Sequence, residues 1–286
     1  VVLARVTRAE SREVERDGAE ALGEDRQVVA EVGPCAHTRT GAVQEQQRRL
    51  DAQQRFIRFL EKEGRLHRAI EYLPSDDELA LRRTNRRGLT APQHAVLLAY
   101  AKMWRFDVLV ASSLPDDPWV ASVISRYFPR ALAERYAGYI ERHPLKREII
   151  ATHVTNSMLN RVGSTFVHRL LEATGAQPHE IVRAYLLSRE VFGFVALWKA
   201  IDTLDNRVED ALQAAMLIDM SRELERGTTW FVRSRRLTED MAATIAHFAP
   251  RVEALAAGLP SLLDASGRAR IGAAVADYVA KGVPEA

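Results

Sequence analysis

Residues 90–111 read TAPQHAVLLAYAKMWRFDVLVA, and this stretch decides the fold class. Thr90 and Gln93 have capping-box spacing, and the proline between them stands in the first turn, where its missing N–H costs little. Apolar residues then recur every three or four positions, at Leu97, Leu98, Ala101, Trp104 and Val108. This period predicts an amphipathic helix with one buried face. We expect His94, just inside the helix start, to face solvent.

Similar helix signals continue in both directions from this stretch. Ser75 and Glu78 repeat the capping-box spacing, and Gly64 can end a helix that runs through residues 56–60. A longer helix is expected after Asn206, and the tail should break near its prolines at 250 and 260. Shorter helices are expected over residues 119–126, 129–140, 145–162, 164–173, 178–189 and 194–204. Because no repeat period is visible, the sequence predicts a mainly α fold, an irregular array of many helices.

The first 48 residues differ from the rest of the chain. They are rich in Arg, Glu and Gly, poor in aromatic residues, and without sustained helical periodicity. Such a composition predicts a poorly ordered segment, because it buries too little apolar surface to offset the entropy of folding. Residues 49–286 should form the helical region, with a candidate sub-boundary near residues 205–210.

Composition excludes several classes of protein. Forty basic and thirty-eight acidic side chains leave a net charge of +2, which argues against nucleic acid or a membrane surface as partner. The single cysteine, Cys35, fits a reducing compartment. The longest apolar runs, at 95–101 and 191–198, are too short to cross a bilayer. These features predict a soluble, cytoplasmic protein.

The sequence contains no recognisable cofactor or metal motif. No two of its fifteen glycines are two residues apart, so the dinucleotide-binding fingerprint is absent. Glycine pairs at 18 and 23 and at 267 and 272 have phosphate-loop spacing, but no lysine follows them. His179 and Glu180 lack the second histidine of a zinc protease. We therefore expect no catalytic, cofactor-binding or metal-binding residue in this chain.

Paired acidic residues are better explained by helix capping than by catalysis. They stand at 76–77, 116–117 and 209–210, all at predicted helix starts. Two neighbouring carboxylates can perform acid–base chemistry when their environments separate their pKa values. At a helix start, however, the helix dipole already favours negative charge, so no catalytic role is needed.

Two local patterns remain as contact candidates. Thr152, Asn156 and Asn160 recur at four-residue spacing and form a polar stripe on one predicted helix. The stripe is either a ligand-contacting face or a set of amide hydrogen bonds between packed helices, and we favour the second. Trp230 and Arg233 stand one turn apart and could form an exposed cation–π pair, although core packing would explain the tryptophan equally well.

An ordered set of short stretches points to a known family. Residues 72–79 read YLPSDDEL and residues 114–119 read LPDDPW. Further stretches lie at 56–58, 60–61, 63–66, 88–90, 97–102, 127–129, 147–152, 156–158 and 204–208. In this order, over about residues 50–265, they resemble the C-terminal region of the large bacterial NAD-specific glutamate dehydrogenases.

The resemblance implies a function for the parent enzyme and a supporting one for this chain. The parent family oxidatively deaminates L-glutamate to 2-oxoglutarate and ammonia, with NAD as cofactor. Its catalytic lysine and aspartate and its nucleotide-binding glycines lie upstream, so no catalytic residue is carried over and no cofactor is expected on this chain. The resemblance implies a helical assembly or regulatory part, inactive alone, whose partners are the catalytic core and other subunits of a homo-oligomer.

Residues 1–48 depart from the family pattern. We expect this segment to be non-native, as if an out-of-frame translation joined the family frame near Leu50. The alternative function is a stand-alone helical protein-interaction module. The coding sequence upstream distinguishes the two, since a glutamate dehydrogenase core there favours the first.

Overall fold

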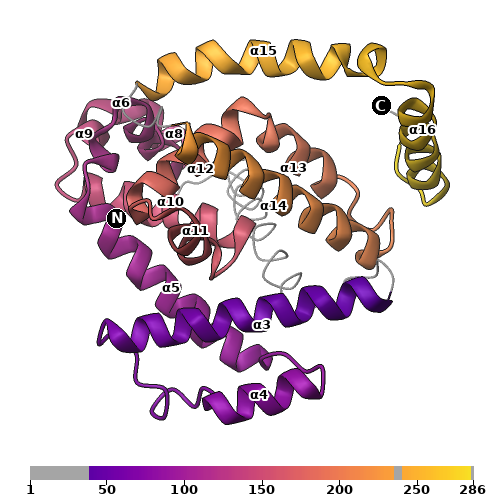
Figure 1. The fold of residues 1–286 in the computed structure, drawn as a ribbon. Coiled ribbons are helices and arrows are strands. Elements are labelled where there is room, and N and C mark those ends of the chain that lie inside the picture. Colours follow the sequence, from indigo (N-terminus) through magenta and orange to yellow (C-terminus); the bar gives the residue numbers. More distant parts are fainter. Residues whose placement is uncertain (1–38, 235–239, 285–286) are drawn as a thin grey trace. The chain divides into compact units, whose positions relative to one another are not determined.

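The computed structural model describes residues 39–234 and 240–284 (Figure 1). These residues form helices and no strand, which confirms the predicted mainly α fold. Cys35 and the rest of residues 1–38 lie outside the described part. In chain order the helices are α3 (Arg39–Lys62), α4 (Asp76–Thr84), α5 (Ala91–Ala111), the 3-10 helix η1 (Leu114–Asp116), α6 (Pro118–Ala121), α7 (Ile124–Tyr127), α8 (Arg130–Arg135), α9 (Ala137–Glu141), α10 (Lys146–Val162), α11 (Phe166–Thr174), α12 (Pro178–Val191), α13 (Phe194–Asp202), α14 (Asp210–Arg233), α15 (Met241–Leu262) and α16 (Ala265–Ala280).

The described chain divides into two compact units. The first holds residues 46–169, and the second holds residues 39–45 together with 170–234 and 240–284. Residues 205–210, where the sequence suggested a sub-boundary, lie in the second unit, in the connection from α13 to α14 and at the first residue of α14. Residues 39–48, which composition had grouped with the N-terminal segment, form the first turns of α3.

The core of the first unit is built from α3, α5 and α10. Phe56 and Ile57 of α3 are fully buried, and the Phe56 ring lies 5.6 Å from the Trp104 indole of α5. Met158 of α10 is fully buried as well. The face of α5 predicted from its period is confirmed at Leu97, Ala101 and Trp104, whereas Leu98 and Val108 are only partly buried. The Phe56 and Trp104 rings thus contribute much of the apolar surface that is buried between α3 and α5.

The expectation that His94 faces solvent was wrong. His94 is only 6 % exposed, and its Nδ1 lies 3.3 Å from Nε2 of Gln53 on α3. Burial, and then the charge of Arg49, lower the pKa of His94, so the neutral imidazole is favoured. His94 precedes Leu97 by three positions and therefore belongs to the same buried face.

One buried arginine joins α5 to the turn between α10 and α11. Arg105 is 1 % exposed, and its Nη2 donates to the carbonyl oxygens of Gly163 at 2.8 Å and Ser164 at 2.7 Å. Gly163 ends α10 with a φ of +77°, a conformation that side-chain-bearing residues rarely adopt. Arg105 therefore supplies donors to carbonyls at the end of a helix, where backbone acceptors lack partners within the helix.

The predicted helix starts are confirmed at several positions. The Ser75 hydroxyl accepts from the Glu78 amide while the Glu78 carboxylate accepts from the Ser75 amide, which completes the capping box of α4. Thr90 and Gln93 form the same arrangement at α5. Asp117 accepts from the first amides of α6, so capping accounts for that carboxylate.

The Asp76 carboxylate connects α3, α4 and the segment between them. It accepts from Gln54 at 2.9 Å, from Arg68 at 2.8 Å and from Arg58 at 3.1 Å. The hydrogen bonds from Gln54 and then Arg68 hold the pKa of Asp76 well below its usual range. Arg68 also bonds Glu61 at the end of α3.

In the second unit, α12 packs against α13, α14 and α15. Its residues from Ala184 to Ser188 are almost completely buried. Gly227 of α14 faces α12 closely, since an added Cβ would lie 2.9 Å from the Phe192 ring and 3.2 Å from Ser188 Oγ. A glycine is needed at this crossing because any side chain would meet α12 and the residue that follows it.

The expected break near Pro250 was wrong, whereas the break expected near Pro260 falls just after it, between Leu262 and Ala265. α15 runs without interruption from Met241 to Leu262 and contains both Pro250 and Pro260 (Figure 1). Each proline removes one N–H and displaces the carbonyl four residues earlier. Those carbonyls belong to Ala246 and Ala256, which are exposed, so water can solvate them. Two predicted helices instead divide, at residues 122–123 and at Tyr136.

Replacing Gly227 should test the close crossing. Gly227→Ala should lower the free energy of unfolding by up to about 2 kcal/mol, because an overpacking cost of about 1–3 kcal/mol exceeds the gain of about 1 kcal/mol from the helix preference of alanine. Gly258→Ala in α15, whose Cβ would meet nothing within 4 Å, should instead raise it by about 0.5–1 kcal/mol. Denaturant unfolding measures both changes, and an equal gain in the two variants would contradict the clash.

The contribution of Asp76 to the free energy of unfolding should depend on pH. Its folded pKa is depressed, so its contribution is present above the unfolded pKa near ~4 and is lost as pH falls through the folded value. Because the side chain is 43 % exposed, we expect Asp76→Asn to cost only about 1 kcal/mol at pH 7. The gap from wild type should shrink below about pH 4. Asp77→Asn, in the same turn, is the control and should show a smaller cost; a gap that widens in acid would contradict the assignment.

Candidate functional site

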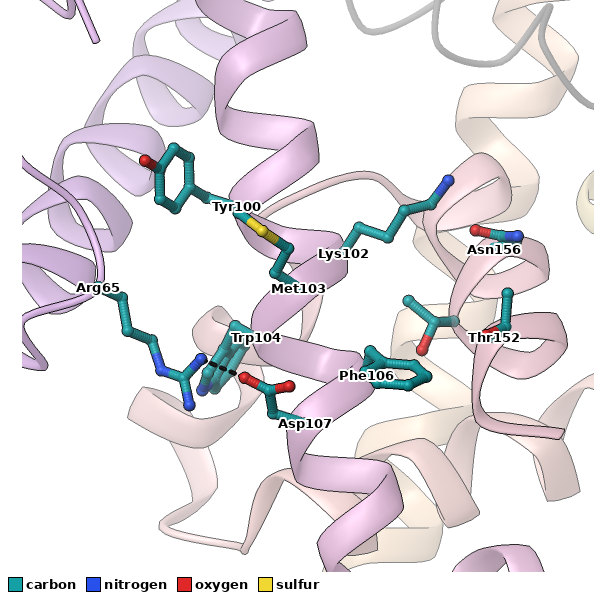
Figure 2. A pocket seen from close by; sticks show the side chains of 10 residues that line it. Arg65, Tyr100, Lys102, Met103, Trp104, Phe106, Asp107, Thr152 and Asn156 are labelled. Atoms are coloured by element: carbon teal, nitrogen blue, oxygen red, sulfur yellow. Dashed lines mark hydrogen bonds and ion pairs between the residues drawn. The ribbon is translucent and has the colours of Figure 1, made fainter. Parts of the chain in front are cut away.

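A groove of about 570 Å³ runs along α5 in the first unit (Figure 2). Its walls come from Arg65, which follows the end of α3, and from the helices α5 and α10. The lining residues are Arg65, Tyr100, Lys102, Met103, Trp104, Phe106, Asp107, Thr152, Thr155 and Asn156. The volume lies within the range of about 300–1,000 Å³ that is usual for small-molecule sites. Because two long helices supply nine of these residues, the walls are held by rigid elements.

One side of the groove is fixed by an ion pair and a hydrogen bond. Arg65 and Asp107 lie 2.6 Å apart, from guanidinium to carboxylate, as the dashed line in Figure 2 marks. The Tyr100 hydroxyl donates to Glu71 at 2.7 Å. That hydrogen bond raises the pKa of Tyr100, so the phenol stays protonated at neutral pH. The charges of Arg65 and Asp107 cancel, so these two residues add no net charge to this side of the groove.

The other side contains polar groups without a partner in the described chain. Thr155 Oγ1 and Asn156 Oδ1 are both shielded from solvent and make no hydrogen bond with described residues. Lys102 reaches from α5 toward Asn156 in Figure 2. Its side chain is exposed, and no ion pair of the described residues involves it. An unsatisfied buried polar atom costs about 1–3 kcal/mol, so two neighbouring ones mark this wall as unusual.

The apolar part of the groove lies between these two sides. Met103 is half exposed, Phe106 is partly buried, and Trp104 is almost fully buried in the core beneath. Figure 2 shows the Phe106 ring on the α10 side of α5 and Met103 nearer to Tyr100. An apolar wall with a few placed polar groups is typical of a ligand site.

The contact candidates taken from the sequence fall into different places. Asn156 and Thr152 line the groove, whereas Asn160, the third member of the polar stripe, does not. Sequence reasoning had not singled out Lys102 or Thr155. The signal was nevertheless present, because Lys102 is one of only five lysines and Thr155 adjoins the stripe.

Trp230 and Arg233 lie in the second unit, on α14. The Trp230 indole is 47 % exposed and packs edge-on against Phe231 at 4.9 Å and Phe248 at 5.5 Å between ring centroids. Among the described residues, a guanidinium lies over an aromatic ring at Arg135 and Tyr136, not at Arg233 and Trp230. Trp230 therefore contacts aromatic neighbours, and a role for it or for Arg233 in binding stays a prediction.

The described residues hold neither a metal-binding cluster nor a bilayer-spanning helix. No group of three or more His, Cys, Asp or Glu side chains is arranged there to hold a metal ion. Within residues 39–234 and 240–284, no helix has both the length and the apolar character needed to span a bilayer.

Comparison with known proteins identifies the chain's relatives. The family described as "Glutamate dehydrogenase, C-terminal" matches residues 86–286. The NAD-specific glutamate dehydrogenase of Halomonas elongata is 42 % identical over 81 % of this chain. Enzymes of the same name from Pseudomonas aeruginosa and Mycobacterium tuberculosis are 39 % and 33 % identical over 83 % and 80 % of it.

The match covers only a small part of those relatives. It spans 14 % of the Halomonas and Mycobacterium proteins and 15 % of the Pseudomonas protein. The resemblance seen in the sequence is thereby confirmed, and the groove helices α5 and α10 lie inside the matched residues. The chain belongs to the family of glutamate dehydrogenase C-terminal regions.

Proposed function

We propose that this chain is the C-terminal helical part of an NAD-dependent glutamate dehydrogenase, that it serves assembly and regulation of that enzyme in the cytoplasm, and that it is inactive alone. The parent reaction would be oxidative deamination of L-glutamate to 2-oxoglutarate and ammonia, with NAD bound elsewhere in the enzyme. The small share of the relatives that the chain spans supports this division of labour. Its partners would be the catalytic core and other subunits.

The observation that carries the assembly role is an apolar stripe on α15. The stripe residues alternate in steps of four and three, which is the spacing of a coiled-coil seam. They are Met241, Ile245, Phe248, Val252, Leu255, Leu259 and Leu262. Its first part is used inside the second unit, where Met241 is fully buried and Phe248 packs on Trp230 and Phe231.

The second part of the same stripe is left uncovered. Leu255, Leu259 and Leu262 are 59 %, 43 % and 69 % exposed. Full burial of one such side chain contributes about 1.5–3 kcal/mol, so a row of three favours a helical partner. Ile271, Val275 and Val279 form a second exposed row on α16. In an assembly, a partner would cover these apolar rows, whereas on a free surface they would stay in contact with water.

The stand-alone interaction module remains the second candidate, because the same exposed rows would serve an unrelated partner. A glutamate dehydrogenase core encoded upstream, in frame or one frameshift away, favours the first function. A complete separate gene favours the second.

The inactivity of the chain alone is directly testable. Purified chain mixed with L-glutamate and NAD should produce no NADH, because the family's catalytic residues match no position here. Absorbance of NADH over time is the measurement, with a full-length relative as positive control. Measurable turnover that depends on the purified chain would overturn this part of the proposal.

The exposed stripe should make the chain self-associate or bind the rest of the enzyme. Replacing Leu255, Leu259 and Leu262 together by Gln should shift the chain toward monomer in sedimentation and light scattering, and weaken its binding to the remaining enzyme by at least about tenfold. The control replaces Leu81, Leu132 and Leu145, which are similarly exposed in the first unit. If both triple variants behave alike, the α15 stripe is not the assembly surface.

A further inference from the structure

Assembly through α15 does not account for the groove along α5. The groove lies in the first unit and has charge and polarity of its own. Arg65 is neutralised by Asp107, so Lys102 leaves the lining with one net positive charge. Lys102 has no acidic partner among the described residues, and the groove is therefore suited to a ligand with one negative charge.

The position of Lys102 indicates which negatively charged group the ligand carries. Figure 2 shows its ammonium directed toward Asn156, with the Phe106 ring on the same side of α5. A lysine ammonium is a compact donor that pairs well with a carboxylate. A ligand carboxylate would meet Lys102 here, while the carbon skeleton behind it would lie on Phe106 and Met103.

The two unsatisfied oxygens add a second requirement. Asn156 Oδ1 can only accept a hydrogen bond, and Thr155 Oγ1 can accept or donate one. Both oxygens are shielded from solvent, and Figure 2 shows the Lys102 side chain directed toward Asn156. Since Lys102 is exposed and flexible, it can turn toward a carboxylate and open the path to Asn156. A donor on the ligand, close to its carboxylate, would then satisfy Oδ1.

We propose that this groove is a binding site for a small monocarboxylate with a hydrogen-bond donor on the carbon next to the carboxylate and an apolar body. Lys102 binds the carboxylate, Asn156 Oδ1 accepts from the donor, and Thr155 Oγ1 donates a hydrogen bond to the carboxylate. Met103 and Phe106 contact the apolar body. Binding involves no covalent step, and it does not require that α15 be an assembly surface.

The probe that tests this site is 3-phenyllactate, which combines a carboxylate, an adjacent hydroxyl and a phenyl ring. Titration calorimetry of the purified chain should give saturable binding with a Kd of about 1 mM or tighter. 3-Phenylpropanoate lacks the hydroxyl and 2-phenylethanol lacks the carboxylate, so each should bind at least about tenfold more weakly. Absence of saturable 3-phenyllactate binding up to about 10 mM would overturn the proposal.

Matched variants locate the binding. Lys102→Met keeps the length of the side chain and removes its charge, and it should weaken 3-phenyllactate binding at least about tenfold. Lys199→Met, at an exposed lysine of α13 in the second unit, should leave the Kd unchanged. Equal Kd values for wild type and Lys102→Met, or a loss of binding in Lys199→Met, would place the ligand elsewhere and overturn the proposal.

A second variant separates binding from folding. Thr155→Val removes a hydroxyl without a partner and keeps the shape, so thermal stability should stay the same or rise while 3-phenyllactate binding weakens. A marked loss of stability would mean that the hydroxyl is satisfied inside the fold, against the proposal. The triple α15 variant should still bind the probe, which keeps failure of the groove distinct from failure of the assembly role.

Discussion

The contact of Arg105 with the end of α10 is the constraint on which the first unit depends. A guanidinium inside a helical core is costly unless carbonyl or carboxylate oxygens receive its N–H groups. Here the oxygens belong to Gly163 and Ser164, where a helix end would itself lack donors. These two carbonyl oxygens accept the N–H groups of Arg105 Nη2. The contact also joins α5 to the end of α10, and these two helices supply most of the groove lining.

Much of this arrangement could be predicted from local patterns. The capping boxes at Ser75 and Thr90 and the inner face of α5 at Leu97, Ala101 and Trp104 follow from spacing alone, because they depend on residues within one helix. His94 shows the limit. Its place just inside a helix start suggested solvent, but its side chain is buried and lies against Gln53 on another helix. Arg105 was unpredictable for the same reason, since its acceptors lie 58 and 59 residues away.

The prolines of α15 show a different limit. A proline removes one hydrogen bond wherever it stands, but the cost depends on whether the freed carbonyl can reach water. Along α15 the carbonyls concerned are exposed, so the helix continues and carries its apolar stripe past the part that packs on α12 and α14. The groove is subject to the same limit. Sequence spacing found Thr152 and Asn156, but only the fold brings Lys102 and Phe106 opposite them.

The two exposed features of the chain call for different kinds of partner. The α15 stripe has leucines in coiled-coil spacing and, among residues 252–262, only one charged side chain, Glu253, so nonpolar burial against another helix suits it. The groove has a single net charge and two unsatisfied oxygens, which a flat apolar helix would leave buried and unpaired at a cost of about 1–3 kcal/mol each. A small polar ligand removes that cost. Stability alone would favour valine at Thr155, because its buried hydroxyl has no partner among the described residues, whereas the proposed ligand would give that hydroxyl one.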